Sequence, residues 1–196
     1  RTPREMVRLF DPLAEHAEIQ AALHDAARRV IDSGQYTFGA EVEAFEADLA
    51  QYLGLEAQSV VALGSGTDAL LLALRAAGVG PGDEVIVPAF SFIATASVVL
   101  WVGARPVFAD IDPQTLSVCA EDAASLVTPK TRALIVAHLF GHPADLTRLQ
   151  TLCESHKIAL IEDAAQALGA KWRGQPVGTV GEMGALSFFP TKHVGA

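Results

Sequence analysis

Cysteine is scarce in this chain, and its pattern excludes two common architectures. The 196 residues contain two cysteines, Cys119 and Cys153, which are far apart and have no Cys-x-x-Cys spacing. This excludes a disulfide framework and a cysteine-rich zinc site, and it favours a reducing, cytoplasmic location. The six histidines show no metal-ligand arrangement beyond one pairing of Cys153 with His156, which we interpret as structural.

Long hydrophobic runs and clustered positive charge are also absent. The longest apolar stretch, residues 92–104, is interrupted by Thr95 and Ser97 and is shorter than the roughly 20 residues of a membrane-spanning helix. The first residues contain no apolar signal core. The net charge is -9 and no basic stripe is present, so we expect neither a membrane nor a nucleic acid as a partner.

Hydrophobic residues, by contrast, are abundant. They make up 51% of the chain, and the mean hydropathy of +0.31 is high for a soluble protein. Such a composition favours strands that are buried on both faces or a surface that a second subunit covers. The length suits one sizeable core, so we expect an α/β protein, organised as an N-terminal helical segment over residues 1–55 and a large domain over residues 56–196.

The first 55 residues carry helical periodicity. Apolar residues from Leu13 to Ile31 predict an amphipathic helix over residues 11–32, which ends near Ser33 and Gly34. A second helix is predicted over residues 41–53 and stops at Gly54. Neither helix carries obvious chemistry.

From residue 59 short β-rich runs alternate with helical segments, a pattern typical of a parallel sheet with helices on its faces. We therefore predict a three-layer α/β/α arrangement. The predicted strands are residues 60–63, 84–87, 106–109, 133–138 and 158–161, and the apolar run 185–189 also has strand character. The predicted helices are residues 68–77, 91–102 and 145–156.

In open α/β sheets ligands bind at the carboxyl ends of the strands, so the residues after each strand are the candidates for function. The first group is residues 64–68, Gly-Ser-Gly-Thr-Asp. Glycines that allow close approach, the free N–H groups of a helix start and the Thr67 hydroxyl would suit a phosphate. The same residues also suit a tight turn with Thr67 or Asp68 as the helix N-cap, and the motif alone does not separate the two.

Four further side chains follow later strands. Phe92 offers a ring for stacking, although a single phenylalanine is more often part of a core. Asp163 directly follows an apolar strand, where it would either cap the next turn or meet a buried cation. Ser187 lies within the last apolar run, Lys192 follows that run, and Lys192 taken alone would be a solvated surface charge.

Together with the amide of Gln166, these positions supply what pyridoxal 5′-phosphate requires. That cofactor needs a lysine that bonds to its aldehyde, an acid that keeps its pyridine nitrogen protonated, and a phosphate site.

The chain resembles the DegT/DnrJ/EryC1/StrS family of sugar aminotransferases over residues 30–196. Five motifs in the family's order carry this resemblance: Gly66-Thr-Asp-Ala-Leu70, residues 80–88, residues 103–113, Ile161-Glu-Asp-Ala-Ala-Gln166 and Ser187-Phe-Phe-Pro-Thr-Lys192. The resemblance implies the large domain of a fold-type I enzyme, a mostly parallel sheet flanked by helices, with pyridoxal 5′-phosphate as cofactor.

It also implies roles for individual residues. Lys192 would bond covalently to the cofactor and shuttle the proton, and Asp163 would face the pyridine nitrogen. Gln166 would neighbour the ring hydroxyl, and Phe92 would stack on the ring. The phosphate would be held by three residues: Gly66, Thr67 and Ser187.

The reaction implied is transfer of an amino group, with glutamate as the expected donor, to a keto group of a nucleotide-linked sugar, in a homodimer. Two alternatives stay open: dehydration of a deoxysugar, which relatives carry out with histidine in place of the lysine, and a non-catalytic cofactor-binding or regulatory protein. The chain departs from the family at His193, where asparagine is common, and it ends at Ala196, so we expect the N-terminal half of such an enzyme, without the small C-terminal domain.

Overall fold

The structure is a computed structural model that describes residue 11 and residues 16–194. The chain divides into two compact units between Ala62 and Leu63. The division predicted from the sequence, between residues 55 and 56, stays a prediction.

The first unit consists of helices. They are α2 (Gln20–Ser33), α3 (Ala40–Leu53) and the short 3-10 helix η1 (Ala57–Ser59). Gly34 and Gly54 end α2 and α3 in the left-handed conformation, with φ of 68° and 72°, which glycine adopts without strain. Both predicted helices are present, but α2 begins at Gln20 rather than residue 11, and Leu13 lies outside the described residues.

The second unit is built on a five-stranded sheet in which every pairing is parallel. Its strands are β1 (Glu84–Pro88), β2 (Arg105–Ala109), β3 (Thr131–Ala137), β4 (Ala159–Asp163) and β7 (Met183–Ala185), in the order β2-β1-β3-β4-β7. A separate antiparallel hairpin joins β5 (Lys171–Trp172) to β6 (Gln175–Pro176).

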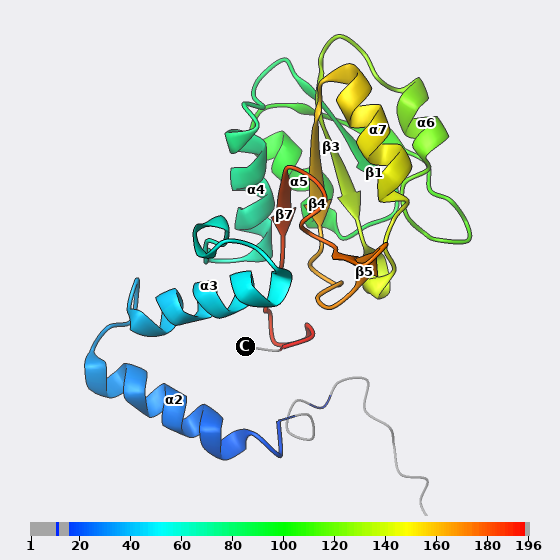
Figure 1. The fold of residues 1–196 in the computed structure, drawn as a ribbon. Coiled ribbons are helices and arrows are strands. Elements are labelled where there is room, and N and C mark those ends of the chain that lie inside the picture. The colour runs from blue at the N-terminus through cyan, green and yellow to red at the C-terminus, as the bar shows by residue number, and fades with distance from the viewer. Residues whose placement is uncertain (1–10, 12–15, 195–196) are drawn as a thin grey trace, which may run out of the picture. The chain divides into compact units, whose positions relative to one another are not determined.

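Helices cover both faces of this sheet (Figure 1). One face carries α4 (Gly66–Ala76) and α5 (Ile93–Trp101), and the other carries α6 (Ala120–Ser125) and α7 (Leu146–His156). The short 3-10 helix η2 (Leu139–Gly141) follows β3. The predicted three-layer α/β/α fold is confirmed.

Side chains alternate between the two faces of each strand. On β4, Ile161 joins the core beneath α4 and α5, whereas Leu160 joins the core beneath α7. The next two residues continue this alternation, so Glu162 faces the α7 side and Asp163 faces the α5 side. Adjacent acids therefore meet different surroundings.

Two strand predictions were wrong. Residues 60–63 form no strand, because a strand needs a hydrogen-bonded neighbour and no described strand pairs with them; Val61 is 68% exposed. The run 185–189 is strand only at Ala185, where its neighbour β4 also ends at the paired Asp163. Sequence periodicity also did not reveal α6 or the β5–β6 hairpin. None of the described helices has the length and apolar composition needed to cross a bilayer.

Candidate functional site

Asp163 ends β4 at the carboxyl edge of the sheet, and its side chain is nearly buried at 8% exposure. The Thr95 hydroxyl of α5 donates a hydrogen bond to Asp163 Oδ2 at 2.8 Å, and the Ala165 N–H donates to Oδ1 at 3.3 Å. Ser91 extends this chain of contacts, since its hydroxyl lies 2.8 Å from that of Thr95. Asp163 is thus a buried acceptor that α5 holds in place.

Burial raises the pKa of Asp163, because the charged form loses its hydration. The hydrogen bonds from Thr95 and Ala165, and to a smaller extent the charges of His138 and Lys192, lower that pKa, but they do not offset burial. A carboxyl in this position gains from any cationic group that approaches it. The arrangement is therefore suited to pairing with a cation.

The amino end of α4 lies against Ser187. A Cβ on Gly66 would lie 3.1 Å from the Leu186 backbone oxygen and 3.1 Å from Ser187 Cβ, so only glycine permits this approach without movement. The free N–H groups of the first turn, which includes Thr67, therefore begin beside the Ser187 hydroxyl. This combination suits an anion.

The N-cap of α4 is Ser65, and the alternative of Thr67 or Asp68 as N-cap was wrong. Ser65 has an extended backbone, and its hydroxyl oxygen accepts the Asp68 N–H at 3.1 Å. Gly66 is already the first helical residue. Thr67 is therefore in the first turn, with its hydroxyl not used as the cap.

Phe92 is the N-cap residue of α5 and is 64% exposed, so it is not a core side chain. The Phe92 carbonyl accepts the Thr95 N–H at 3.1 Å. Phe92 therefore lies one helical turn before Thr95, whose hydroxyl donates to Asp163. An exposed ring in this position is available for stacking on a planar ligand.

Gln166 lies in the loop after β4. Its Oε1 accepts the Phe140 N–H at 3.1 Å, and Phe140 has the left-handed φ of 56°, which is uncommon for a bulky side chain. Because the oxygen accepts this bond, the NH2 group of the Gln166 amide can donate to another partner.

Lys192 lies in a turn after β7, where its N–H donates to the Phe189 carbonyl at 2.7 Å. It is half-buried, whereas the other three lysines, Lys130, Lys157 and Lys171, are exposed. Its charge acts on Asp163, so both groups belong to one electrostatic environment.

The structure thus brings Gly66 next to Ser187 and Asp163 next to Thr95, while Gln166 contacts the loop after β3. Sequence reasoning missed Thr95 as a site residue. The available signal was a hydroxyl within an otherwise apolar helix that directly follows a strand end.

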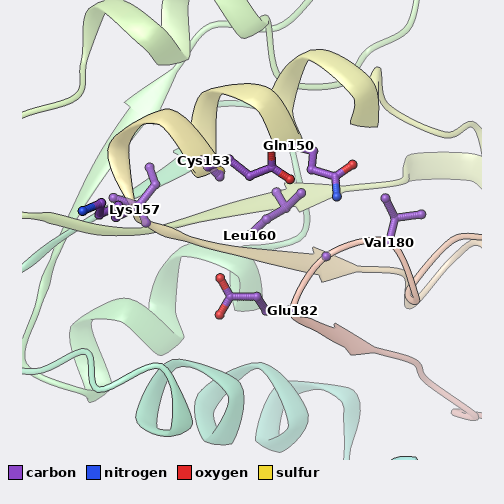
Figure 2. A pocket seen from close by; sticks show the side chains of 9 residues that line it. Gln150, Cys153, Lys157, Leu160, Val180 and Glu182 are labelled. Carbon is purple, nitrogen blue, oxygen red and sulfur yellow. The ribbon is translucent and has the colours of Figure 1, made fainter.

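A hollow of about 310 Å³ lies elsewhere on this unit, beside α7. Figure 2 shows that its walls include Gln150, Cys153 and Lys157 on one side and Val180 and Glu182 on the other, with Leu160 of β4 between them. It contains none of the predicted site residues. Among the residues that the structure describes, no group of three or more His, Cys, Asp or Glu side chains is placed to hold a metal ion.

Comparison with known proteins matches residues 17–196 to the model of the DegT/DnrJ/EryC1/StrS aminotransferase family. A UDP-N-acetyl-3-dehydro-α-D-glucosamine 3-aminotransferase from Acidithiobacillus ferrooxidans is 42% identical over 100% of this chain and 52% of its own length. A dTDP-3-amino-3,4,6-trideoxy-α-D-glucose transaminase from Streptomyces venezuelae is 45% identical over 99% of this chain and 50% of its own. The chain therefore spans about half the length of these relatives.

Solved structures agree with these sequence matches. The crystal structure of DesV from S. venezuelae, in complex with a ketimine intermediate, superposes with a TM-score of 0.92 at 42% identity. The superposition covers 96% of this chain and 50% of that one.

Proposed function

This chain belongs to the DegT/DnrJ/EryC1/StrS aminotransferase family, and from that premise we propose that it is a pyridoxal 5′-phosphate-dependent aminotransferase. The proposed reaction moves an amino group from glutamate to a keto group of a nucleotide-linked sugar. The sugars named for the two relatives, one UDP-linked and one dTDP-linked, support this substrate class.

The observation that carries the proposal is the buried carboxyl of Asp163. Its raised pKa reflects lost hydration that its hydrogen bonds do not replace. A protonated pyridine nitrogen is a compact cation with one N–H donor, which supplies both the missing charge and a further hydrogen bond. The residues present therefore fit this cofactor, and Thr95 would aim the carboxylate toward it.

The other groups fit the remaining parts of the cofactor. The first-turn amides of Gly66 and Thr67 and the Ser187 hydroxyl would hold the phosphate. Phe92 would stack on one face of the ring, and the Gln166 NH2 group would donate to the ring oxygen. The close approach of Gly66 to Ser187, the exposure of Phe92 and the hydrogen bond of Gln166 support these assignments.

Lys192 is the proposed base. When bound, the cofactor withdraws electrons from the substrate carbon that carries the amine. The Lys192 amine would then remove the proton from that carbon. In the reverse sequence with the keto sugar, it would deliver a proton to the sugar carbon that receives the amino group. A lysine at this position is also the observation that favours amino transfer over the dehydration that histidine-bearing relatives carry out.

A coupled assay tests the proposal. The protein with pyridoxal 5′-phosphate and glutamate should release 2-oxoglutarate continuously, beyond the amount equivalent to the cofactor present, only when a keto sugar nucleotide is added, and Lys192→Ala should abolish the release. Release that is undiminished in Lys192→Ala would contradict the assignment. So would its absence with both UDP-linked and dTDP-linked keto sugars.

We also propose that the protein is a cytoplasmic homodimer. Ile93, Leu100 and Trp101 form an exposed apolar stripe on α5, because residues seven and eight positions apart lie on one side of a helix, two turns from each other. A second copy of the chain would bury this stripe. Light scattering should report a dimer, and Leu100→Lys should shift it toward the monomer; an unchanged mass would contradict the use of this face. The two free cysteines support a reducing compartment.

A further inference from the structure

Glu162 is fully buried and accepts four hydrogen bonds. Its Oε1 accepts the N–H groups of Val180 and Gly181, at 2.7 Å and 2.6 Å. Its Oε2 accepts the Gly178 N–H at 2.8 Å and lies 2.9 Å from Nε2 of His138. The turn before β7 is therefore wrapped around one carboxylate.

All four partners donate hydrogen bonds, so the Glu162 side chain must be an ionised carboxylate, which offers about four lone-pair sites and no proton. Burial alone would raise the pKa of Glu162, but the hydrogen bonds from His138 and the backbone amides outweigh it and lower the pKa. An amide or a protonated acid would place a donor against another donor.

The His138 ring connects Glu162 to a second segment. Its Nδ1 accepts the Ala144 N–H at 3.1 Å, so Nδ1 carries no proton and Nε2 donates to Glu162. The ring is fully buried. It closes the base of the loop over residues 139–144.

Glu162 and His138 are connected to the proposed cofactor site through three segments of the backbone. The backbone N–H of His138 donates to the Asp163 carbonyl at 3.0 Å. Within the loop that His138 closes, the Phe140 N–H donates to Gln166. The turn that Glu162 holds leads into β7, whose Ala185 pairs with Asp163 and precedes Ser187.

We propose that Glu162 and His138 are positioning residues, which together set the places of Asp163 and Gln166 for the cofactor without touching it. One carboxylate ties the turn at 178–181 to β4, and its histidine partner ties the loop at 139–144 to the same strand end. The inference rests on the proposed function for its link to the cofactor, whereas the mechanical link between the two loops stands on the hydrogen bonds alone.

Amide hydrogen exchange of the cofactor-free protein tests the mechanical link in Glu162→Gln. This change keeps the size of the side chain but leaves N–H groups facing an NH2 group. Exchange should accelerate at residues 178–181 and also at the His138, Phe140 and Ala144 amides, on the far side of the ring.

Glu84→Gln is the matched control. Glu84 is also a buried strand glutamate, bonded to Arg105 at 2.6 Å and to the Thr128 hydroxyl at 2.7 Å, but it lies at the opposite end of the sheet. This variant should leave the exchange of Phe140 and Ala144 unchanged. Acceleration confined to residues 178–181 in Glu162→Gln would overturn the inference.

Equilibrium titration with pyridoxal 5′-phosphate tests the link to the site. At a temperature where both variants are folded, Glu162→Gln should raise the dissociation constant about tenfold, or about 1.4 kcal/mol, while Glu84→Gln leaves it near the wild-type value. An unchanged constant in folded Glu162→Gln would refute the positioning role. Wild-type protein that binds no cofactor would contradict the proposed function instead, and the exchange pattern would still decide the mechanical link.

His138→Gln gives a second, milder test if Glu162→Gln does not fold. It removes the acceptor of the Ala144 N–H and leaves the three backbone bonds of Glu162 in place. Faster exchange at Phe140 and Ala144 with weaker cofactor binding would support the inference. Slow exchange there, as in the wild type, would refute it.

Discussion

Replacing Asp163 with asparagine should stabilise the cofactor-free protein at neutral pH while removing its activity. The change is nearly isosteric and can keep every hydrogen bond. The new oxygen can accept the Ala165 N–H, and the new NH2 group can donate to the Thr95 oxygen. Thr95 can then turn its own hydroxyl toward Ser91, which lies 2.8 Å away.

The size of the gain follows from the raised pKa of Asp163. An acid whose folded pKa lies above its unfolded value, 3.8, destabilises the fold increasingly as pH rises from that value to the folded pKa. The cost is constant above the folded pKa and vanishes below the unfolded one. Asparagine removes about 1.4 kcal/mol of this cost for every pH unit that separates the folded pKa from the unfolded one, and each kcal/mol raises the melting temperature by about 2–4 °C in a chain of this length.

Thermal unfolding of the cofactor-free protein measures the effect. The advantage of Asp163→Asn should be small at about pH 4.5 and should grow toward about pH 8. Asp145→Asn is the control, because Asp145 is an exposed N-cap of α7 and asparagine caps equally well. A melting temperature of Asp163→Asn below that of the wild type, or a gain that does not grow with pH, would contradict this explanation.

The same variant should behave oppositely once the cofactor is present. It should still bind some pyridoxal 5′-phosphate through the proposed phosphate-binding residues Gly66, Thr67 and Ser187. Turnover should fall on the order of 100-fold or more, because the charge that would keep the ring protonated is missing. Undiminished transamination would refute the role of Asp163.

Three further substitutions and modifications probe other parts of the structure. In Gly66→Ala, the new Cβ lies 3.1 Å from a neighbouring backbone oxygen, so cofactor titration should show severalfold weaker binding with little change in unfolding temperature. In Gly184→Ala, the Cβ would overlap the backbone oxygen of Gly178, so denaturant unfolding should show a loss of about 3 kcal/mol or more; a stable variant would contradict the packing of β7. Burial raises the pKa of Cys153 to about 12, so iodoacetamide at about pH 8 should alkylate Cys119 first, as peptide mapping would show, and equal rates would contradict the burial of Cys153.

Much of the sheet could be predicted because its strands are short apolar runs between helical segments. Asp163, which comes just after the apolar run 158–161, indicated the edge of the sheet where the site lies. Parallel strands have their carboxyl ends at a common edge, and ligands bind there. The contact of Thr95 with Asp163 could not be predicted, since it joins residues 68 positions apart and depends on how α5 packs.

The failures have equally physical causes. Residues 60–63 have the composition of a strand, but composition does not supply the neighbour that a strand requires. The buried pair of Glu162 and His138 was invisible because both residue types are usually exposed or intermediate, and only the fold shows that four donors surround one carboxylate.

The central claim is that Lys192 holds the cofactor, and chemical trapping tests it most directly. The protein is incubated with pyridoxal 5′-phosphate, reduced with borohydride and mapped by peptide mass spectrometry. We expect the cofactor to be attached to the half-buried Lys192 and the exposed Lys130, Lys157 and Lys171 to remain unmodified. Attachment at one of those three, or an equal distribution over all four lysines, would contradict it.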